Sequence, residues 1–154
     1  MIKFKFTKVN LKKEFNFLIW DKYLGTGNYI LHKDLCKDMK CFDNVRNLEV
    51  GKYCLGNKIH SEPPRISNLF EIKDNALVYT ISNNIMFDDS KEKLHRLVLE
   101  SNKIKRYIHF RFYELLKNAE RIQEGILKNS FHLMYDDKVM GVISGIRKEK
   151  NESN

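Results

Sequence analysis

The chain has 154 residues, and its 28 Lys and Arg against 20 Asp and Glu give a formal net charge of +8 at pH 7. A hydrophobic fraction of 42% with only 2 prolines and 7 glycines is typical of one folded domain and excludes a collagen-like or low-complexity chain. The basic excess favours a polyanionic partner, such as nucleic acid, or an acidic protein surface.

The N-terminal stretch "MIKFKFTKVNLKKEF" alternates lysines with apolar residues, so it lacks the continuous apolar segment of a signal peptide. Nowhere does the chain reach the run of about 18 apolar residues that a membrane span needs. The 3 cysteines, an odd number, do not indicate a disulfide framework. We therefore expect a soluble, cytoplasmic protein with reduced thiols and no membrane partner.

Hydrophobic periodicity in the first half of the chain predicts two strands and two helices. Asn10 can cap the first helix, and the "GTG" that follows this helix ends it. The predicted strands cover 2–6 and 28–33, and the predicted helices cover 11–24 and 34–42. Residues 51–59 could hold a further strand between their two glycines.

In the second half, both prolines lie in "SEPPRISNLF", which predicts a turn leading into a short helix. Residues 76–82 are rich in β-branched and aromatic side chains and predict a strand. The remaining predicted elements are a helix over 91–100, a long helix over 102–128 and a hairpin over 131–144 that turns at Asp136 and Asp137. For this acidic pair, a turn is favoured over a catalytic dyad.

Together these elements predict a single α+β domain over 1–147 and a frayed, charged tail over 148–154. The domain is expected to have one mixed or antiparallel sheet, packed by the long helix of its C-terminal half.

Two faces are expected on the predicted helix over 102–128. Apolar residues at spacings of three and four form a stripe suited to packing: Ile104, Ile108, Phe112, Leu115, Ala119, Ile122 and Ile126. The opposite face interleaves cations with aromatic rings: Lys103, Arg106, Phe110, Tyr113, Lys117 and Arg121. Such a face suits nucleic acid, because cations neutralise phosphates and rings stack on bases. The alternative is that Phe110 and Tyr113 pack against a neighbouring element while the charges reach solvent.

A metal site is a weaker hypothesis, with Cys36, Cys41, Cys54 and His60 as candidate ligands. Their spacings are longer than those of most zinc sites, so three unrelated buried thiols are favoured instead and no cofactor is expected. Glu71 and Lys73, with Asp43 upstream, loosely match a metal-dependent nuclease pattern, for which a surface ion pair is the simpler interpretation.

Two histidines could act as general acid and base in metal-free RNA cleavage. His109 lies beside the basic face of the predicted long helix, and His132 lies on the following strand. A structural role is the alternative for each of them.

The leading functional hypothesis is a small basic domain that binds RNA or a ribonucleoprotein, and that is more a binding protein than an enzyme. One alternative is a protein-binding inhibitor or accessory factor of a nucleoprotein machine, encoded by a virus or mobile element. Another is a small metal-independent endoribonuclease that uses His109 and His132. The oligomeric state is not predicted.

Overall fold

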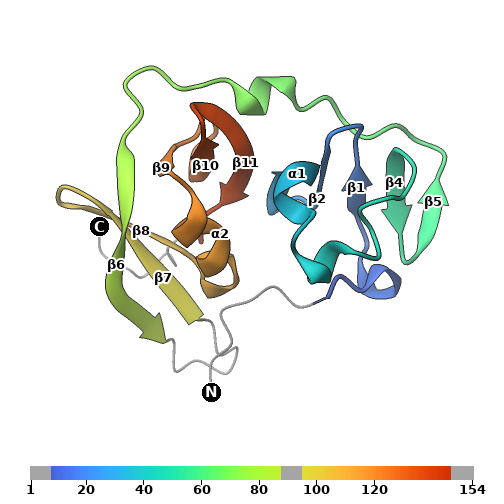
Figure 1. Ribbon diagram of the computed structural model, residues 1–154, viewed down its shortest axis with the longest axis horizontal. Helices are drawn as coiled ribbons and strands as arrows, with labels where there is room; N and C mark the ends of the chain where they lie inside the picture. The colour runs from blue at the N-terminus through green and yellow to red at the C-terminus, as the bar shows by residue number, and fades with distance from the viewer. Residues whose placement is uncertain (1–7, 88–94, 147–154) are drawn as a thin grey trace.

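A computed structural model describes residues 8–87 and 95–146 of the protein (Figure 1). The described strands form one 11-stranded antiparallel sheet in the order β5-β4-β1-β2-β3-β11-β10-β9-β6-β7-β8. The strands of the first half are β1 (Phe17–Ile19), β2 (Tyr23–Gly25), β3 (Tyr29–His32), β4 (Gly51–Cys54) and β5 (Asn57–Ile59). Those of the second half are β6 (Val78–Phe87), β7 (His95–Ser101), β8 (Ile104–His109), β9 (Arg121–Glu124), β10 (Ser130–Tyr135) and β11 (Lys138–Ser144).

The described helical segments are all short; η1 precedes β1, and the others lie in the connections between strands. They are η1 (Leu11–Lys13), α1 (Lys33–Cys36), η2 (Lys40–Phe42), η3 (Ser67–Phe70), η4 (Phe110–Phe112) and α2 (Tyr113–Asn118). None of the helices in the described ranges has the length and hydropathy needed to cross a bilayer.

The second half of the sheet, β6 to β11, bends back on itself, and we call it the curled sheet. The backbone N–H of Ile146, just beyond β11, donates to the carbonyl of Tyr107 on β8 at 2.8 Å. This bond joins the chain after β11 to the strand at the end of the sheet order, so the six strands wrap around a common interior. The interior is filled by side chains that are at most 2% exposed: Leu97, Leu99, Ile108, Phe131 and Leu133.

One hydrophobic core runs through both halves of the sheet. Tyr29 on β3 lies in the contact between them, with its ring centroid 6.3 Å from that of Phe42 and 6.0 Å from that of Phe112. The guanidinium of Arg111 lies over the Tyr29 ring at 5.6 Å, so a cation–π contact adds to the packing.

The segment between the halves, residues 60–77, crosses from β5 to β6, and its η3 turn packs on the sheet. Leu69 and Phe70 of η3 pack on a small cluster formed by Met134, Val139 and Val142. His132 on β10 anchors the same segment, with its Nε2 2.7 Å from the carbonyl oxygen of Leu69.

The prediction of an α+β domain packed by a long helix is wrong. Residues 102–128 form β8, η4, α2 and β9, and the longest α-helix in the described residues is α2, with 6 residues. The structure is dominated by one antiparallel sheet. The helix predicted over 11–24 is also wrong, because this stretch forms η1, β1 and β2, and residues 95–100 lie in β7 rather than in a helix.

Other predictions are confirmed in the described residues. The strands expected over 28–33 and 76–82 are β3 and the first part of β6, and the hairpin over 131–144 is β10–β11. Its two turn residues, Asp136 and Asp137, have φ of 50° and 59°, a conformation that Asp tolerates better than most residues. The predicted strand over 2–6 and the tail over 148–154 lie outside the described residues.

Candidate anion-binding site at one end of the curled sheet

The six residues predicted to form a basic helix face are distributed over different elements. Lys103 lies in the β7–β8 turn and Arg106 on β8, whereas Tyr113 and Lys117 lie on α2. Because β8 runs from Ile104 to His109 before entering η4 and α2, the first pair lies at one end of the strand and the second pair at the other.

The two aromatic residues of the predicted face are engaged in packing. Phe110 and Tyr113 are partly buried against the main core. The Phe110 ring also stacks on that of His109, with centroids 4.8 Å apart, and Lys117 Nζ lies 5.9 Å from the centre of the Tyr113 ring. Both rings therefore have a packing role, which is the alternative that the sequence left open.

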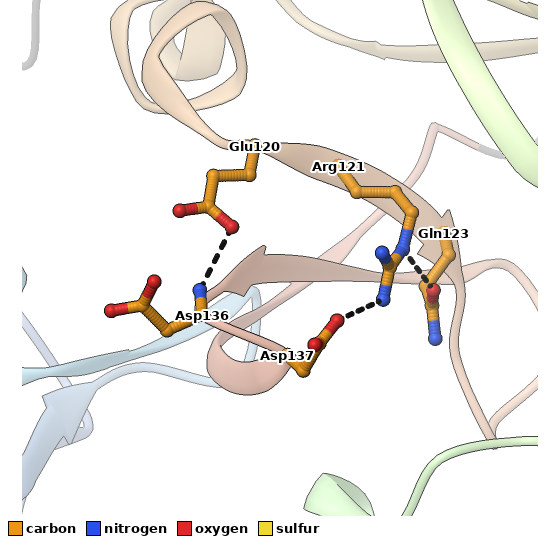
Figure 2. A network of polar contacts seen from close by, with 5 residues as sticks. All are labelled: Glu120, Arg121, Gln123, Asp136 and Asp137. Carbon is orange, nitrogen blue, oxygen red and sulfur yellow. Dashed lines mark hydrogen bonds and ion pairs between the residues drawn. The ribbon is translucent and has the colours of Figure 1, made fainter.

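Arg121 is part of a polar network at the start of β9, shown in Figure 2. Its Nε donates to Gln123 Oε1 at 2.9 Å, and its terminal nitrogen lies 3.3 Å from Asp137 Oδ1. In the same network, Asp136 N donates to Glu120 Oε2 at 2.9 Å. The network links the β10–β11 turn to β9, and the ion pair with Asp137 gives Arg121 a structural role.

Arg106, by contrast, is an exposed residue that lines a hollow. A cavity of about 250 Å³ opens at the end of the curled sheet where β8 begins and β9 ends. We call it the Arg106 cavity, and its lining residues are Lys73, Tyr79, Arg106, Glu124, Ile126, Leu127, Lys128, Asn129, Ser130 and Phe131. Arg106 pairs across the sheet with Leu99, which is buried in the interior, so its side chain leaves β8 on the inner face of the curled sheet.

Tyr79 on β6 presents a polar group to this cavity. The Arg106 guanidinium lines the same cavity and acts electrostatically on this hydroxyl. Burial raises the pKa of Tyr79 above its ordinary value, while the Arg106 guanidinium opposes that rise. The hydroxyl is therefore protonated at neutral pH. A guanidinium can only donate, so Arg106 cannot accept the hydroxyl proton, which remains available to an anion.

The carboxylate of Glu124 is the acidic group of the cavity, and it is already paired. Lys73 Nζ lies 3.0 Å from Glu124 Oε2, and the backbone N–H of Leu77 donates to Glu124 Oε1 at 3.4 Å. Among the described residues, no carboxylate forms an ion pair with Arg106 or Lys128. Within the described part of the chain, the cavity therefore keeps two positive charges without a counter-charge, which favours an anionic ligand.

The β9–β10 loop positions Lys128 at the rim of the cavity. Gly125 N donates to the carbonyl of Ser130 at 2.9 Å, and Ser130 Oγ donates to that of Leu127 at 2.6 Å. Asn129 has a φ of 61°, and its carbonyl accepts from Gly145 N at 2.8 Å. The loop is thus closed on itself and bonded to the chain beyond β11, which makes it a defined support for the lysine.

The two candidate catalytic histidines have structural partners. His109 Nδ1 accepts from the backbone N–H of Arg111 at 3.1 Å and so caps η4. His132 is fully buried on β10 and bonds Leu69. Since an acid–base pair needs access to substrate, these positions lend no support to the endoribonuclease hypothesis, which stays a prediction.

The candidate metal ligands are not gathered into a site. The described residues contain no group of three or more His, Cys, Asp or Glu side chains placed to hold a metal ion. Cys36 is buried, and burial raises the pKa of its thiol to about 12. Cys54 is on β4, and His60 is exposed just beyond β5.

Most of the cavity could not be found from the sequence alone. Lys73, Arg106 and Lys128 come from three separated segments, and only the fold brings them together. The sequence places Lys73 in a nuclease-like pattern with Glu71, but in the structure its ion-pair partner is Glu124. No known protein family matches the chain, and neither curated proteins nor solved structures show a significant similarity to it.

Proposed function

We propose that the protein binds nucleic acid, RNA in the first instance, and that the Arg106 cavity and its rim are the contact surface. The observation that carries this proposal is the placement of Lys73, Arg106 and Lys128 around one hollow whose single carboxylate is already paired. The basic excess of the whole chain, +8 at pH 7, supports it by attracting a polyanion from a distance.

Salt dependence is the signature of this kind of contact, because each phosphate that a cation neutralises releases counterions. Arg106 and Lys128 supply two cations. Lys103, which is exposed in the β7–β8 turn and close to Arg106 in sequence, adds a third. Three such contacts to a single strand predict a log–log slope of affinity against salt of about −2.

The test is a fluorescence-anisotropy titration of a labelled single-stranded RNA at low and moderate salt. The test variant is Arg106→Glu with Lys128→Glu. Its matched control is Lys117→Glu with Lys138→Glu, which makes the same change in net charge at exposed positions on α2 and in the β10–β11 hairpin.

We expect the cavity variant to lose at least about tenfold in affinity and the control to lose much less, because only the former removes phosphate contacts. Equal losses would mean that the protein attracts RNA through its overall charge and not through the cavity. No binding by the native protein at low salt would refute nucleic-acid binding altogether.

A second candidate function is that of a protein-binding factor, and one observation favours it. Phe15, Val50, Leu55 and Ile59 are exposed apolar side chains on or beside the β4–β5 hairpin, with Phe15 69% exposed. Leu55 N donates to the carbonyl of Glu14 at 2.7 Å, so the hairpin turn lies against the segment that carries Phe15. β5 is also a terminal strand of the described sheet order, at the opposite end from β8. Exposed edges and apolar patches of this kind often mark protein interfaces.

This alternative is separable from the first. Phe15→Asp with Leu55→Asp should abolish co-purification with a nucleoprotein partner while leaving RNA affinity unchanged. The Arg106→Glu, Lys128→Glu variant should show the opposite pattern if both surfaces are used. If neither pair of substitutions affects co-purification, the β4–β5 hairpin is not the interface.

A further inference from the structure

Resting on the proposed function, we propose that the Arg106 cavity binds the end of a nucleic-acid strand, and specifically a terminal phosphomonoester. Nucleic-acid binding alone does not require this, since a groove that follows the backbone would serve for internal phosphates. Three properties of the cavity favour a chain end: its inner end is blocked, it is small, and its charge matches a dianion.

The cavity does not lead through the molecule. Tyr79 and Phe131 lie in its lining and are 3% and 2% exposed, with ring centroids 5.3 Å apart in an edge-to-face contact. Beyond them, Leu99, Ile108 and Leu133 fill the interior of the curled sheet with no exposed surface. A strand that enters the cavity must therefore end there or turn back.

The size of the cavity sets what can enter. Its volume of about 250 Å³ is less than the roughly 300 to 1,000 Å³ of pockets that enclose whole drug-sized ligands. It can hold a phosphate with part of its sugar, while the rest of the strand lies outside against the rim. The apolar side chains of Ile126 and Leu127, both exposed at the rim, offer surface for that adjoining part.

The charge distinguishes a chain end from an internal phosphate. A terminal phosphomonoester carries about −1.5 to −2 charges at pH 7, with a second pKa near 6, whereas a phosphodiester carries one negative charge. Arg106 and Lys128 supply two positive charges without a counter-charge in the described residues, and Lys73 offsets Glu124. The Tyr79 hydroxyl can donate one hydrogen bond, and the planar guanidinium can donate two in parallel.

The experiment compares four probes of one sequence with an internal fluorescent label: a 5′-phosphorylated strand, a 3′-phosphorylated strand, a strand with hydroxyls at both ends, and a circular strand. We expect at least one phosphorylated strand to bind roughly tenfold more tightly than the hydroxyl and circular strands, as a charge-assisted hydrogen-bond set predicts. The preferred end gives the direction in which the strand enters. The preference should weaken below about pH 6, where the terminal phosphate takes up a proton.

Two variants tie the preference to the cavity. Arg106→Gln should remove most of the discrimination between phosphorylated and hydroxyl ends. Tyr79→Phe keeps the buried ring and its contact with Phe131, so it should fold normally and lose discrimination without weakening the hydroxyl-ended strand. Thermal melting of both variants checks the fold.

The outcomes separate this inference from the function on which it rests. Equal, salt-sensitive binding of all four probes would overturn the terminal-phosphate site and leave nucleic-acid binding in place. Discrimination that survives Arg106→Gln would also overturn it, because the phosphate would then bind elsewhere. Absence of binding by every probe would overturn both.

Discussion

Acidification should destabilise the protein through His132, because this side chain is buried in its neutral form. Its relative exposure is 0%, and its Nε2 lies 2.7 Å from the carbonyl oxygen of Leu69. A carbonyl can only accept, so Nε2 carries the proton and Nδ1 does not. Nδ1 is buried and has no hydrogen-bond partner among the described residues. A second proton there would place a charge in an environment that cannot solvate it.

Burial accordingly lowers the pKa of His132, while the bond to Leu69 opposes that shift. In the unfolded chain, a histidine has a pKa of about 6.5. Above that pH neither state binds the extra proton, so the stabilising effect is fully present. As the pH falls below it, the unfolded state binds the proton before the folded state does. The free energy of unfolding therefore drops, by at most about 1.4 kcal/mol per pH unit, until the folded-state pKa is reached.

The comparison is between the native protein and His132→Gln, whose side-chain amide can still donate to Leu69 but does not titrate. Urea unfolding would be followed from about pH 8 to about pH 5.5, and the native free energy should fall more steeply than that of the variant below about pH 6.5. The other histidines are common to both proteins, so the difference isolates this residue. Parallel pH profiles for the two proteins would refute the reasoning.

Three further predictions concern the cavity, the closure of the curled sheet and the thiols. Glu124→Gln should tighten RNA binding several-fold, because it removes the carboxylate that faces the anion and frees its lysine partner; unchanged anisotropy titrations would show that RNA does not contact this cavity. Gly145→Val should lower the free energy of unfolding by about 1 to 3 kcal/mol, because a Cβ at this position would lie 3.0 Å from the backbone oxygen of Tyr107 on β8. Urea unfolding measures the change. Gly27→Val is the control and should have little effect, because no heavy atom lies within 4 Å of a Cβ placed there. Equal losses for the two glycine variants would contradict the closure. In the folded protein, iodoacetamide at mildly alkaline pH should label Cys54 well before Cys36, because Cys36 is buried and its thiol has a pKa of about 12. Mass spectrometry can follow the labelling of each cysteine. Rapid labelling of Cys36 would contradict its burial.

Local signals sufficed for several elements of the fold. Strand β6 begins with a run of β-branched and aromatic residues, which are enriched in strands. The β10–β11 hairpin has two apolar runs separated by two aspartates, which tolerate the positive φ of a tight turn. In each case the residues that determine the element lie within it.

The prediction of a long helix is wrong because the residues of its apolar stripe belong to several unrelated elements. Ile108 is buried on a strand, Phe112 in a 3-10 turn and Leu115 on a short helix, so their spacings of four and three are coincidental. The two ends of the apolar stripe, Ile104 and Ile126, are 38% and 40% exposed. The overlooked signal was Asn102, which has a φ of 55° in the two-residue turn between β7 and β8.

The β7 strand was mistaken for a helix for a related reason. Leu97, Val98 and Leu99 are all buried, so both faces of the strand are covered and the alternation that marks a half-buried strand is missing. A short, continuous apolar run is compatible with either structure. The candidate site is even harder to predict from local sequence, because the residues of the cavity come together only through strand order and register.

The most direct test of the central claim is a backbone-amide NMR titration with single-stranded RNA, which locates the contact without any substitution. The expected shifts are largest at Lys73, Tyr79 and Arg106 and in the loop over 125–130, and smaller at α2. Shifts centred on α2 or on the β4–β5 hairpin, or no shifts at low salt, would contradict the assignment of the Arg106 cavity as the nucleic-acid site.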